Sequence, residues 1–372
     1  MNIPFHKAHI GQEEVDSICK TLESGWLTMG PKTIEFENSF KDYIGSDFAI
    51  SVSSATAALH LALNAINIKK DDEVIIPTNT FISTSEVVMY LGANPILCDI
   101  KNTDHNIDET LIPNLITPKT KAIIPVHFAG NPCNMDEICK IAESYNLRII
   151  EDAAHALPSI YKDQMIGTVS DATCFSFYAT KTLTTGEGGM VTTNNLEIAN
   201  KIRLQRLHGI SGDAWNRYSK KNDWYYEVVD LGYKYNTTDL QASIGLVQLK
   251  KLEWMKEKRK KIAQKYIESF SGKIDFVKSL SNNQSSWHLF VIKIANRDQL
   301  YQKLQDAGIS TSVHFIPIHH HPYYKKIFGS DDSLYPIANN IYNKSLSLPI
   351  YPSLTEEEVD YIIKNVIKYA QN

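Results

Sequence analysis

Lys181 is the residue whose type and position most directly indicate chemistry in this chain. It follows residues 173–178, whose β-branched and aromatic side chains predict a strand, and it precedes a Thr/Gly-rich segment, 182–189, that cannot continue one. Ligands of open α/β sheets bind past the carboxyl ends of strands. A lysine held there, partly out of water, can lose its proton and form a Schiff base with a carbonyl group. For this segment alone, a lysine in a surface loop is the alternative.

Asp152 is the second candidate, because it directly follows another predicted strand, 147–150. If both strands are parallel, Asp152 and Lys181 emerge at the same edge of the sheet. A carboxylate there can keep the nitrogen of a pyridine ring protonated, and the ring can then take up the electron pair of a substrate carbanion. Without a cofactor, Asp152 would cap the following helix.

A strand-to-helix turn supplies a candidate anion site. The strand 48–52 is followed by Ser53-Ser-Ala-Thr-Ala-Ala-Leu59, which opens a helix. Free backbone N–H groups and the helix dipole favour an anion such as a phosphate at this point. The alternative, in which Ser54 caps the helix for itself, is compatible with that role.

These residues require a sheet to position them. Further strands are predicted at 73–77, 95–98, 122–126 and 190–193, and helices at 11–23, 33–43, 135–145 and 195–207. The alternation predicts an α/β fold with a mostly parallel sheet covered by helices. The length of 372 residues favours one large and one smaller domain, which we place at 1–250 and 251–372, with the boundary inside a long helix, 246–270.

The small domain is predicted to be α+β. Strands are expected at 287–294 and 310–315, and helices at 299–307 and 355–369. His314, His319, His320 and His321 resemble a metal-binding cluster, but consecutive histidines cannot all face one ion and no carboxylate lies within the segment, so no metal site is expected. Residues 208–222 lack periodicity and predict a long loop of the kind that carries function.

Composition limits the class of protein. A net charge of −4 without a basic face gives no electrostatic case for nucleic-acid binding. The five scattered cysteines fit neither a disulfide scaffold nor a zinc site. No signal pattern and no membrane-spanning apolar run are present, so we expect a cytoplasmic protein that does not enter a membrane.

Seven motifs in order resemble one family. They are Ser24-Gly-Trp-Leu-Thr28, Pro77-Thr-Asn-Thr-Phe81, Thr120-Lys-Ala-Ile-Ile-Pro-Val-His127, Glu151-Asp-Ala-Ala-His155, the stretch 175–191, Leu231-Gly-Tyr-Lys-Tyr-Asn236 and Leu346-Ser-Leu-Pro349. Nearly end to end, the chain resembles the DegT/DnrJ/StrS sugar aminotransferases, which have the aspartate-aminotransferase fold of type I pyridoxal-phosphate enzymes. The resemblance implies a large domain with a seven-stranded, mostly parallel sheet and a small C-terminal α+β domain.

The resemblance also implies roles for individual residues. Lys181 would hold pyridoxal 5'-phosphate and move a proton on the substrate, and Asp152 would tune the ring. Phe81 would stack on the ring and His155 would lie near its hydroxyl. The phosphate would be held by Ala55, Thr56, Ser176 and, across a homodimer with shared active sites, by Lys234 or Asn236. Substrate contacts are implied for Trp26, Thr28, His314 and His319.

This sequence departs from the family pattern at three of these positions. Relatives usually carry Gly where this chain has Ala55, and many have Asn and Arg at the places of Lys234 and Asn236. Some relatives share the Lys-Tyr-Asn version.

The activity implied is transfer of an amino group from L-glutamate to a nucleotide-linked keto-sugar, in surface polysaccharide or glycan biosynthesis. The segments 209–215 and 234–236 resemble those of relatives that act at carbon 4 of UDP-linked sugars, which implies a UDP-linked 4-keto-6-deoxy sugar, with dTDP- or GDP-linked 3-keto or 4-keto sugars as the alternative. A sugar dehydratase of the family would carry histidine in place of Lys181. A nicotinamide-dependent oxidoreductase would require Gly-x-Gly-x-x-Gly after the first strand, which Ser53-Ser-Ala-Thr-Ala-Ala does not supply. A catalytically inactive binding or regulatory protein with this fold is disfavoured, because Lys181, Asp152 and the turn predicted to hold the phosphate are all present.

Overall fold

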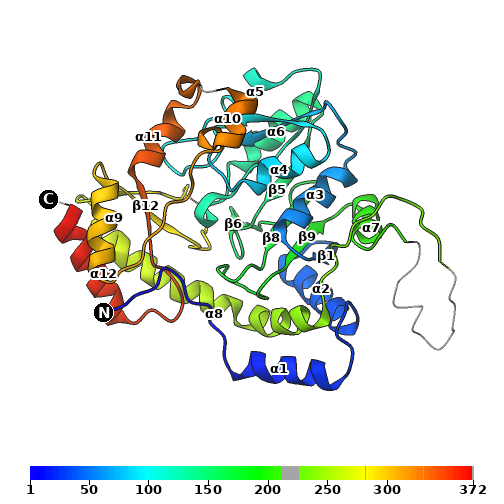
Figure 1. The fold of residues 1–372 in the computed structure, drawn as a ribbon, viewed down its shortest axis with the longest axis horizontal. Helices are drawn as coiled ribbons and strands as arrows, with labels where there is room; N and C mark the ends of the chain where they lie inside the picture. Colours follow the sequence, from blue (N-terminus) through cyan, green and yellow to red (C-terminus); the bar gives the residue numbers. More distant parts are fainter. Residues whose placement is uncertain (211–225, 281, 330, 371–372) are drawn as a thin grey trace.

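A seven-stranded sheet forms the centre of the molecule, in a computed structural model that describes residues 1–210, 226–280, 282–329 and 331–370 (Figure 1). Its strand order is β3-β2-β4-β5-β8-β9-β1. Strand β9 is antiparallel to both of its neighbours, and the other six strands are parallel to one another. The prediction of a mostly parallel α/β sheet is therefore confirmed. The strands are β1 (Phe48–Val52), β2 (Glu73–Pro77), β3 (Asn94–Cys98), β4 (Thr120–Ile123), β5 (Arg148–Asp152), β8 (Ala172–Ser176) and β9 (Gly189–Thr193).

Both faces of this sheet are buried, which explains why apolar residues follow one another along a strand, as Ile149 and Ile150 do in β5. Ile149 and Phe175 belong to the core on one face, and Ile150 and Cys174 belong to the core on the other, as the two-residue period of a strand requires. Helices α2 (Pro31–Ile44), α6 (Met135–Tyr145) and the first part of α8 (Asp239–Phe270) cover the first face. Helices α3 (Ala55–Ala65), α4 (Ser83–Tyr90) and α7 (Leu196–Gln205) cover the second.

Local capping sets where the long helix α8 begins. The Thr238 hydroxyl accepts the backbone N–H of Gln241, and the Gln241 side chain accepts the backbone N–H of Thr238. The Asp239 carboxylate accepts N–H groups from Gly30 and Thr33 at 2.7 and 2.9 Å, so it also caps α2. Helix α1 (Gln12–Glu23) packs along α8, where its Ser17 hydroxyl donates to the carbonyl of Ser243.

A smaller three-stranded antiparallel sheet lies at the other end of α8. It has the order β10-β11-β12, with β10 at Asp275–Phe276, β11 at Phe290–Lys293 and β12 at Ser345–Leu348. Helices α9 (Arg297–Asp306) and α12 (Glu356–Ala370) and the second part of α8 share its core, which also takes in Ile3 from the start of the chain. The remaining elements are short: α5 (Ile112–Leu115), η1 (Phe128–Gly130), the hairpin β6 (Ile160–Tyr161) and β7 (Gln164–Met165), η3 (Ile318–His320), α10 (Pro322–Phe328), η4 (Asp332–Leu334) and α11 (Pro336–Lys344).

The strand expected at 310–315 is wrong. The structure has only isolated bridges there, Ile309 to Ile3 and Ser312 to Ser347. The backbone at the end of this segment and just after it is bound elsewhere, because the Phe315 N–H donates to Asn79 Oδ1 and the Ile318 N–H donates to the carbonyl of Thr78. The chain therefore packs against the loop after β2 instead of extending a sheet.

The division at residue 250 stays a prediction. Leu252 and Met255 of α8 belong to the core around the large sheet, whereas α8 residues from Ile262 onward belong to the core around the small sheet. Helix α8 therefore passes from one core to the other between Met255 and Ile262. Most of the loop expected at 208–222 lies outside the described residues. Among the residues that are described, no helix combines the length and apolar character that crossing a bilayer requires.

Candidate active site

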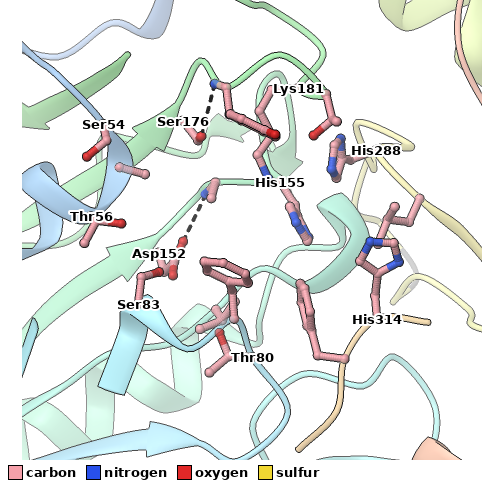
Figure 2. A pocket seen from close by; sticks show the side chains of 18 of the residues that line it. Ser54, Thr56, Thr80, Ser83, Asp152, His155, Ser176, Lys181, His288 and His314 are labelled. Atoms are coloured by element: carbon pink, nitrogen blue, oxygen red, sulfur yellow. Dashed lines mark hydrogen bonds between the residues drawn. The ribbon is translucent and has the colours of Figure 1, made fainter. Parts of the chain in front are cut away.

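A pocket of about 610 Å³ opens at the carboxyl ends of β5 and β8. Its lining comes from the first turn of α3, the loops after β2 and β8, the ends of β5 and β8, and segments that precede β11 and η3 (Figure 2). The pocket brings together most of the predicted site residues, namely Ala55, Thr56, Phe81, Asp152, His155, Ser176, Lys181 and His314.

Lys181 lies in a closely hydrogen-bonded loop after β8. Its N–H donates to the carbonyl of Tyr178 at 2.9 Å, while the carbonyl of Phe177 accepts the N–H of Thr185 at 3.0 Å and closes the loop. Burial lowers the pKa of the Lys181 amine to about 8, and the nearby Asp152 carboxylate opposes that shift. Near neutral pH, a substantial fraction of this amine is therefore unprotonated and nucleophilic.

Asp152 is the last residue of β5 and is buried at the floor of the pocket. Its Oδ1 accepts the N–H of Ala154 at 3.1 Å (Figure 2). Its Oδ2 accepts the hydroxyl of Thr84 at 2.9 Å. Burial raises the pKa of this carboxyl, and the two hydrogen bonds and the charge of Lys181 act in the opposite direction. The carboxylate is therefore fixed in orientation and positioned to hold a cation in the pocket.

The first turn of α3 has the properties of an anion site. Ser54 caps the helix by accepting the N–H of Ala57 at 3.1 Å, and Ala55 and Thr56 line the pocket, at the end of the helix where N–H groups have no intrahelical acceptor. The turn packs directly on Gly189 of β9, where a Cβ atom would lie 2.5 Å from the carbonyl carbon of Ser54. Ser176, at the end of β8, adds a hydroxyl to the same pocket.

His155 is held within a group of aromatic rings. Its centroid lies 4.3 Å from that of His288 and 5.8 Å from that of Phe315, and the last pair is stacked. Its Nδ1 accepts the N–H of Ala129 at 3.3 Å, so the neutral ring carries its proton on Nε2. Burial and the charge of Lys181 hold the pKa of His155 well below the usual histidine value. Phe81 also lines the pocket, although 56% of it is exposed.

Five predicted residues do not line this pocket: Trp26, Thr28, Lys234, Asn236 and His319. The Trp26 indole donates to the carbonyl of Met29, and the Thr28 carbonyl accepts the N–H of Asp239. The roles expected of Lys234 and Asn236 concern a neighbouring subunit, so they stay predictions.

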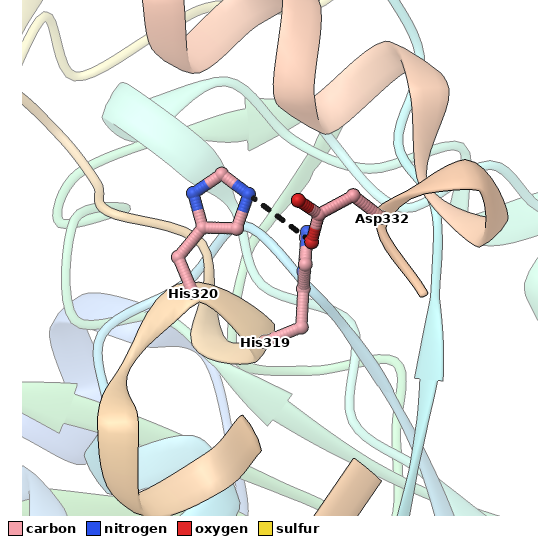
Figure 3. Close-up of side chains that lie close together, drawn as sticks. All are labelled: His319, His320 and Asp332. Atoms are coloured by element: carbon pink, nitrogen blue, oxygen red, sulfur yellow. Dashed lines mark ion pairs between the residues drawn. The ribbon is translucent and has the colours of Figure 1, made fainter. Parts of the chain in front are cut away.

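His319 is buried in a chain of hydrogen bonds away from the pocket. Its Nδ1 lies 2.6 Å from the Thr78 hydroxyl, its Nε2 lies 2.9 Å from Asn339 Oδ1, and Asn339 Nδ2 donates to the carbonyl of Asp332. His319, His320 and the Asp332 carboxylate are close enough for one metal ion, and Nε2 of His320 lies 3.8 Å from Asp332 Oδ1 (Figure 3). Because both His319 nitrogens already have partners, the geometry favours a structural role for this group.

The sequence does not predict two further histidines of the pocket. His6 comes from the start of the chain, and its Nε2 donates to the carbonyl of Ala179 at 3.1 Å. His288 precedes β11 and is 7% exposed. Neither follows a strand of the large sheet, which is the signal that identifies Asp152 and Lys181.

Comparison with known proteins gives one consistent result. The DegT/DnrJ/EryC1/StrS aminotransferase family matches residues 8–367. The spore coat polysaccharide biosynthesis protein SpsC of Bacillus subtilis is 46% identical over 98% of this chain and 96% of its own length.

Solved structures agree with that result. Spr1654 of Streptococcus pneumoniae, a protein assigned as a sugar aminotransferase and solved in PMP and PLP forms, is 34% identical to this chain. Its PMP form has a TM-score of 0.94 and covers 100% of this chain and 99% of its own. Helicobacter pylori PseC, an aminotransferase involved in pseudoaminic acid biosynthesis, is 30% identical with a TM-score of 0.92 over 100% of both chains. The chain therefore belongs to the DegT/DnrJ/EryC1/StrS family, and it is a sugar aminotransferase that uses pyridoxal phosphate.

Proposed function

We propose that this enzyme transfers the amino group of L-glutamate to carbon 4 of a UDP-linked 4-keto-6-deoxy sugar, as a step in surface glycan biosynthesis. The observation that carries the proposal is the convergence of Lys181, Asp152 and the first turn of α3 on one pocket. The choice of sugar rests on the resemblance of residues 209–215 and 234–236 to relatives that act at carbon 4. dTDP- and GDP-linked 3-keto or 4-keto sugars are the alternative.

The lining residues fit pyridoxal phosphate. The close packing of Gly189 on Ser54 leaves the turn at Ala55 and Thr56 facing the pocket, where it offers N–H groups to a phosphate together with the Ser176 hydroxyl. Asp152 would pair with the pyridine nitrogen, Phe81 would pack on the ring, and His155 would donate its Nε2–H to the ring oxygen; all three line the pocket. When bound, the cofactor supplies a carbonyl that takes up the amino group and a ring that withdraws electrons.

The side chains of this chain perform the proton transfers. Nζ of Lys181 would hold the cofactor at rest. Once freed, it would take the proton from the donor carbon that bears the amino group and pass it to the cofactor, and in the second half-reaction it would deliver a proton to the sugar carbon that receives the amino group. The pKa of about 8 lets the same amine act as base and acid near neutral pH. The negative charge of Asp152 would keep a proton on the ring nitrogen, and the hydrogen bonds from Ala154 and Thr84 hold this carboxylate in place.

The working unit in this proposal is a cytoplasmic homodimer with shared active sites, in which Lys234 or Asn236 of one copy contacts the phosphate of the other. The segment before Lys234 supports an interface, because Val228, Val229 and Leu231 are 65%, 56% and 76% exposed, which is unusual for three neighbouring aliphatic residues. All five cysteines are free, which is consistent with a reducing compartment.

The test is a panel of UDP-, dTDP- and GDP-linked 4-keto and 3-keto sugars, each incubated with enzyme, cofactor and L-glutamate while 2-oxoglutarate is measured. Turnover restricted to UDP-linked 4-keto sugars supports the proposal, and preference for another nucleotide or carbon selects the alternative. If none of these sugars supports the release of 2-oxoglutarate, amination of a nucleotide sugar is refuted. Lys181→Ala is the matched inactive control.

A further inference from the structure

Two imidazoles on one wall of the pocket have ring atoms available to a ligand. Figure 2 shows His155, His288 and His314 gathered across the pocket from Ser54 and Thr56. His288 is 7% exposed, and its Nδ1 has no hydrogen-bond partner among the described residues. His314 uses Nδ1 for the Ser347 hydroxyl at 2.9 Å. Nδ1 of His288 is closed off from the pocket, whereas Nε2 of both rings is accessible and has no hydrogen-bond partner among the described residues, so a ligand would pair with Nε2.

The pocket contains little positive charge to receive an anion on this wall. Among its described lining residues, the side chains charged at neutral pH are Asp152, Lys181 and Glu187, and none is an arginine. Arg259 lies behind the wall, where its Nη1 donates to the carbonyls of His288 and Ile350 and is thereby committed to the backbone.

The chemistry of the amino donor requires an anion site close to Lys181. In an amino acid, the α-carboxylate is attached to the same carbon as the amino group, so it must lie next to the reacting atoms. In a nucleotide sugar, the sugar ring separates the diphosphate from the carbon that is aminated. A group near Lys181 and away from the phosphate turn therefore meets a carboxylate in one half-reaction and uncharged sugar atoms in the other.

We propose that His288 and His314 form the subsite for the α-carboxylate of the amino donor, and that an imidazole of this pair takes up a proton as the carboxylate binds. The proposal rests on the aminotransferase function proposed above. When the sugar is bound instead of the donor, a neutral imidazole can donate a hydrogen bond to a sugar hydroxyl or accept one from it. An arginine at the same place would keep an unpaired charge in the pocket.

The electrostatics of the wall support a protonation change. Burial and the charge of Lys181 lower the pKa of His314 to about 4, and burial holds the pKa of His288 well below its usual value, with contributions from His155, Lys181 and Arg259. A carboxylate in contact with an imidazole raises its pKa by about 1–3 units. Donor binding should therefore be coupled to proton uptake and should weaken as the pH rises.

The test uses the holoenzyme and glutarate, a dicarboxylate without an amino or keto group. Titration calorimetry in two buffers of different ionisation enthalpy measures proton uptake at about pH 6 and about pH 8, and the cofactor absorbance recorded alongside corrects for protons taken up at Lys181. We expect uptake at the lower pH that falls at the higher pH. In His288→Gln and His314→Gln, glutarate affinity should fall about tenfold and at least one variant should lose the uptake. The matched control is His105→Gln, which removes a buried histidine outside the pocket.

Proton uptake that is absent in the wild type, or unchanged in both variants, overturns the subsite. If His288→Gln does not fold with cofactor bound, the wild type and His314→Gln decide the matter. Failure of the function itself is recognised separately, because L-glutamate would then leave the absorbance of the wild-type cofactor unchanged. If L-glutamate changes the absorbance of the cofactor but glutarate binds without proton uptake, the subsite alone is rejected.

Discussion

At the scale of single residues, the pocket combines an amine that is easily deprotonated with a carboxylate that is held in place. Both were predicted from their positions after strands, because the carboxyl ends of parallel strands meet at one sheet edge. His6 and His288 could not be predicted in this way, since tertiary packing alone brings the start of the chain and the segment before β11 to that edge.

We expect Asp152→Asn to fold and to bind cofactor but to turn over at least about 100-fold more slowly, because an amide cannot hold the proton of the ring nitrogen. Steady-state rates with saturating glutamate and sugar measure the effect. Thr84→Val removes one of the hydrogen bonds to the same carboxylate and should give a smaller loss. Near-normal turnover of Asp152→Asn would exclude Asp152 from the mechanism.

Lys181 should carry the cofactor. Borohydride reduction followed by digestion should place the pyridoxyl mass on the peptide that contains Lys181, and Lys181→Ala should bind the cofactor without this linkage and lose activity. Mass spectrometry of the reduced wild type decides the point. Label on Lys119, Lys121 or Lys234 would contradict the assignment.

The pKa of Lys181 also predicts how the apoenzyme takes up its cofactor. Below about pH 8, the unprotonated fraction of the amine rises tenfold per pH unit, and above that value it levels off. The rate at which the visible absorption of the linked cofactor appears should follow the same curve. A midpoint near that of an exposed lysine, about 10.4, would show that burial does not lower this pKa.

At the scale of elements, the strands of the large sheet were predictable because their apolar runs are buried on both faces, and strands 48–52 and 73–77 were placed at their observed bounds. The segment 310–315 was not, because its composition suits a strand while the backbone N–H groups of Phe315, its last residue, and of Ile318 bind Asn79 and Thr78. The local sequence pattern carries no information on such long-range hydrogen bonds.

Gly189→Ala tests the packing of β9 on α3. A Cβ atom there would lie 2.5 Å from the carbonyl carbon and 2.8 Å from the N–H nitrogen of the next residue in the Ser54–Ala55 turn. We expect a loss of about 1–3 kcal/mol in the free energy of unfolding and weaker binding of the cofactor phosphate. Chemical denaturation and cofactor titration measure the two effects. The control, Gly11→Ala, adds a methyl group whose nearest neighbour is 3.6 Å away and should leave cofactor affinity unchanged.

At the scale of the whole molecule, the proposed dimer can be tested through the exposed aliphatic segment. Leu231→Asp should convert the dimer to a monomer and abolish activity, because it would place a charge in the apolar interface that we propose to complete the active site. Light scattering and activity are measured on the same sample. Leu334→Asp, at an exposed position in η4, is the control that should remain dimeric. A fully active monomer would reject shared active sites.

The pocket draws its wall from Phe5 and His6 at one extreme of the chain and from Ile350 near the other. During synthesis on a ribosome, the sheet from β1 to β9 can therefore assemble well before the catalytic cavity is closed. Until Ile350 has left the exit tunnel, a nascent chain would expose the amine of Lys181 in an open groove. The nascent chain should therefore bind the cofactor with native affinity only late in translation, after most of the large sheet has formed.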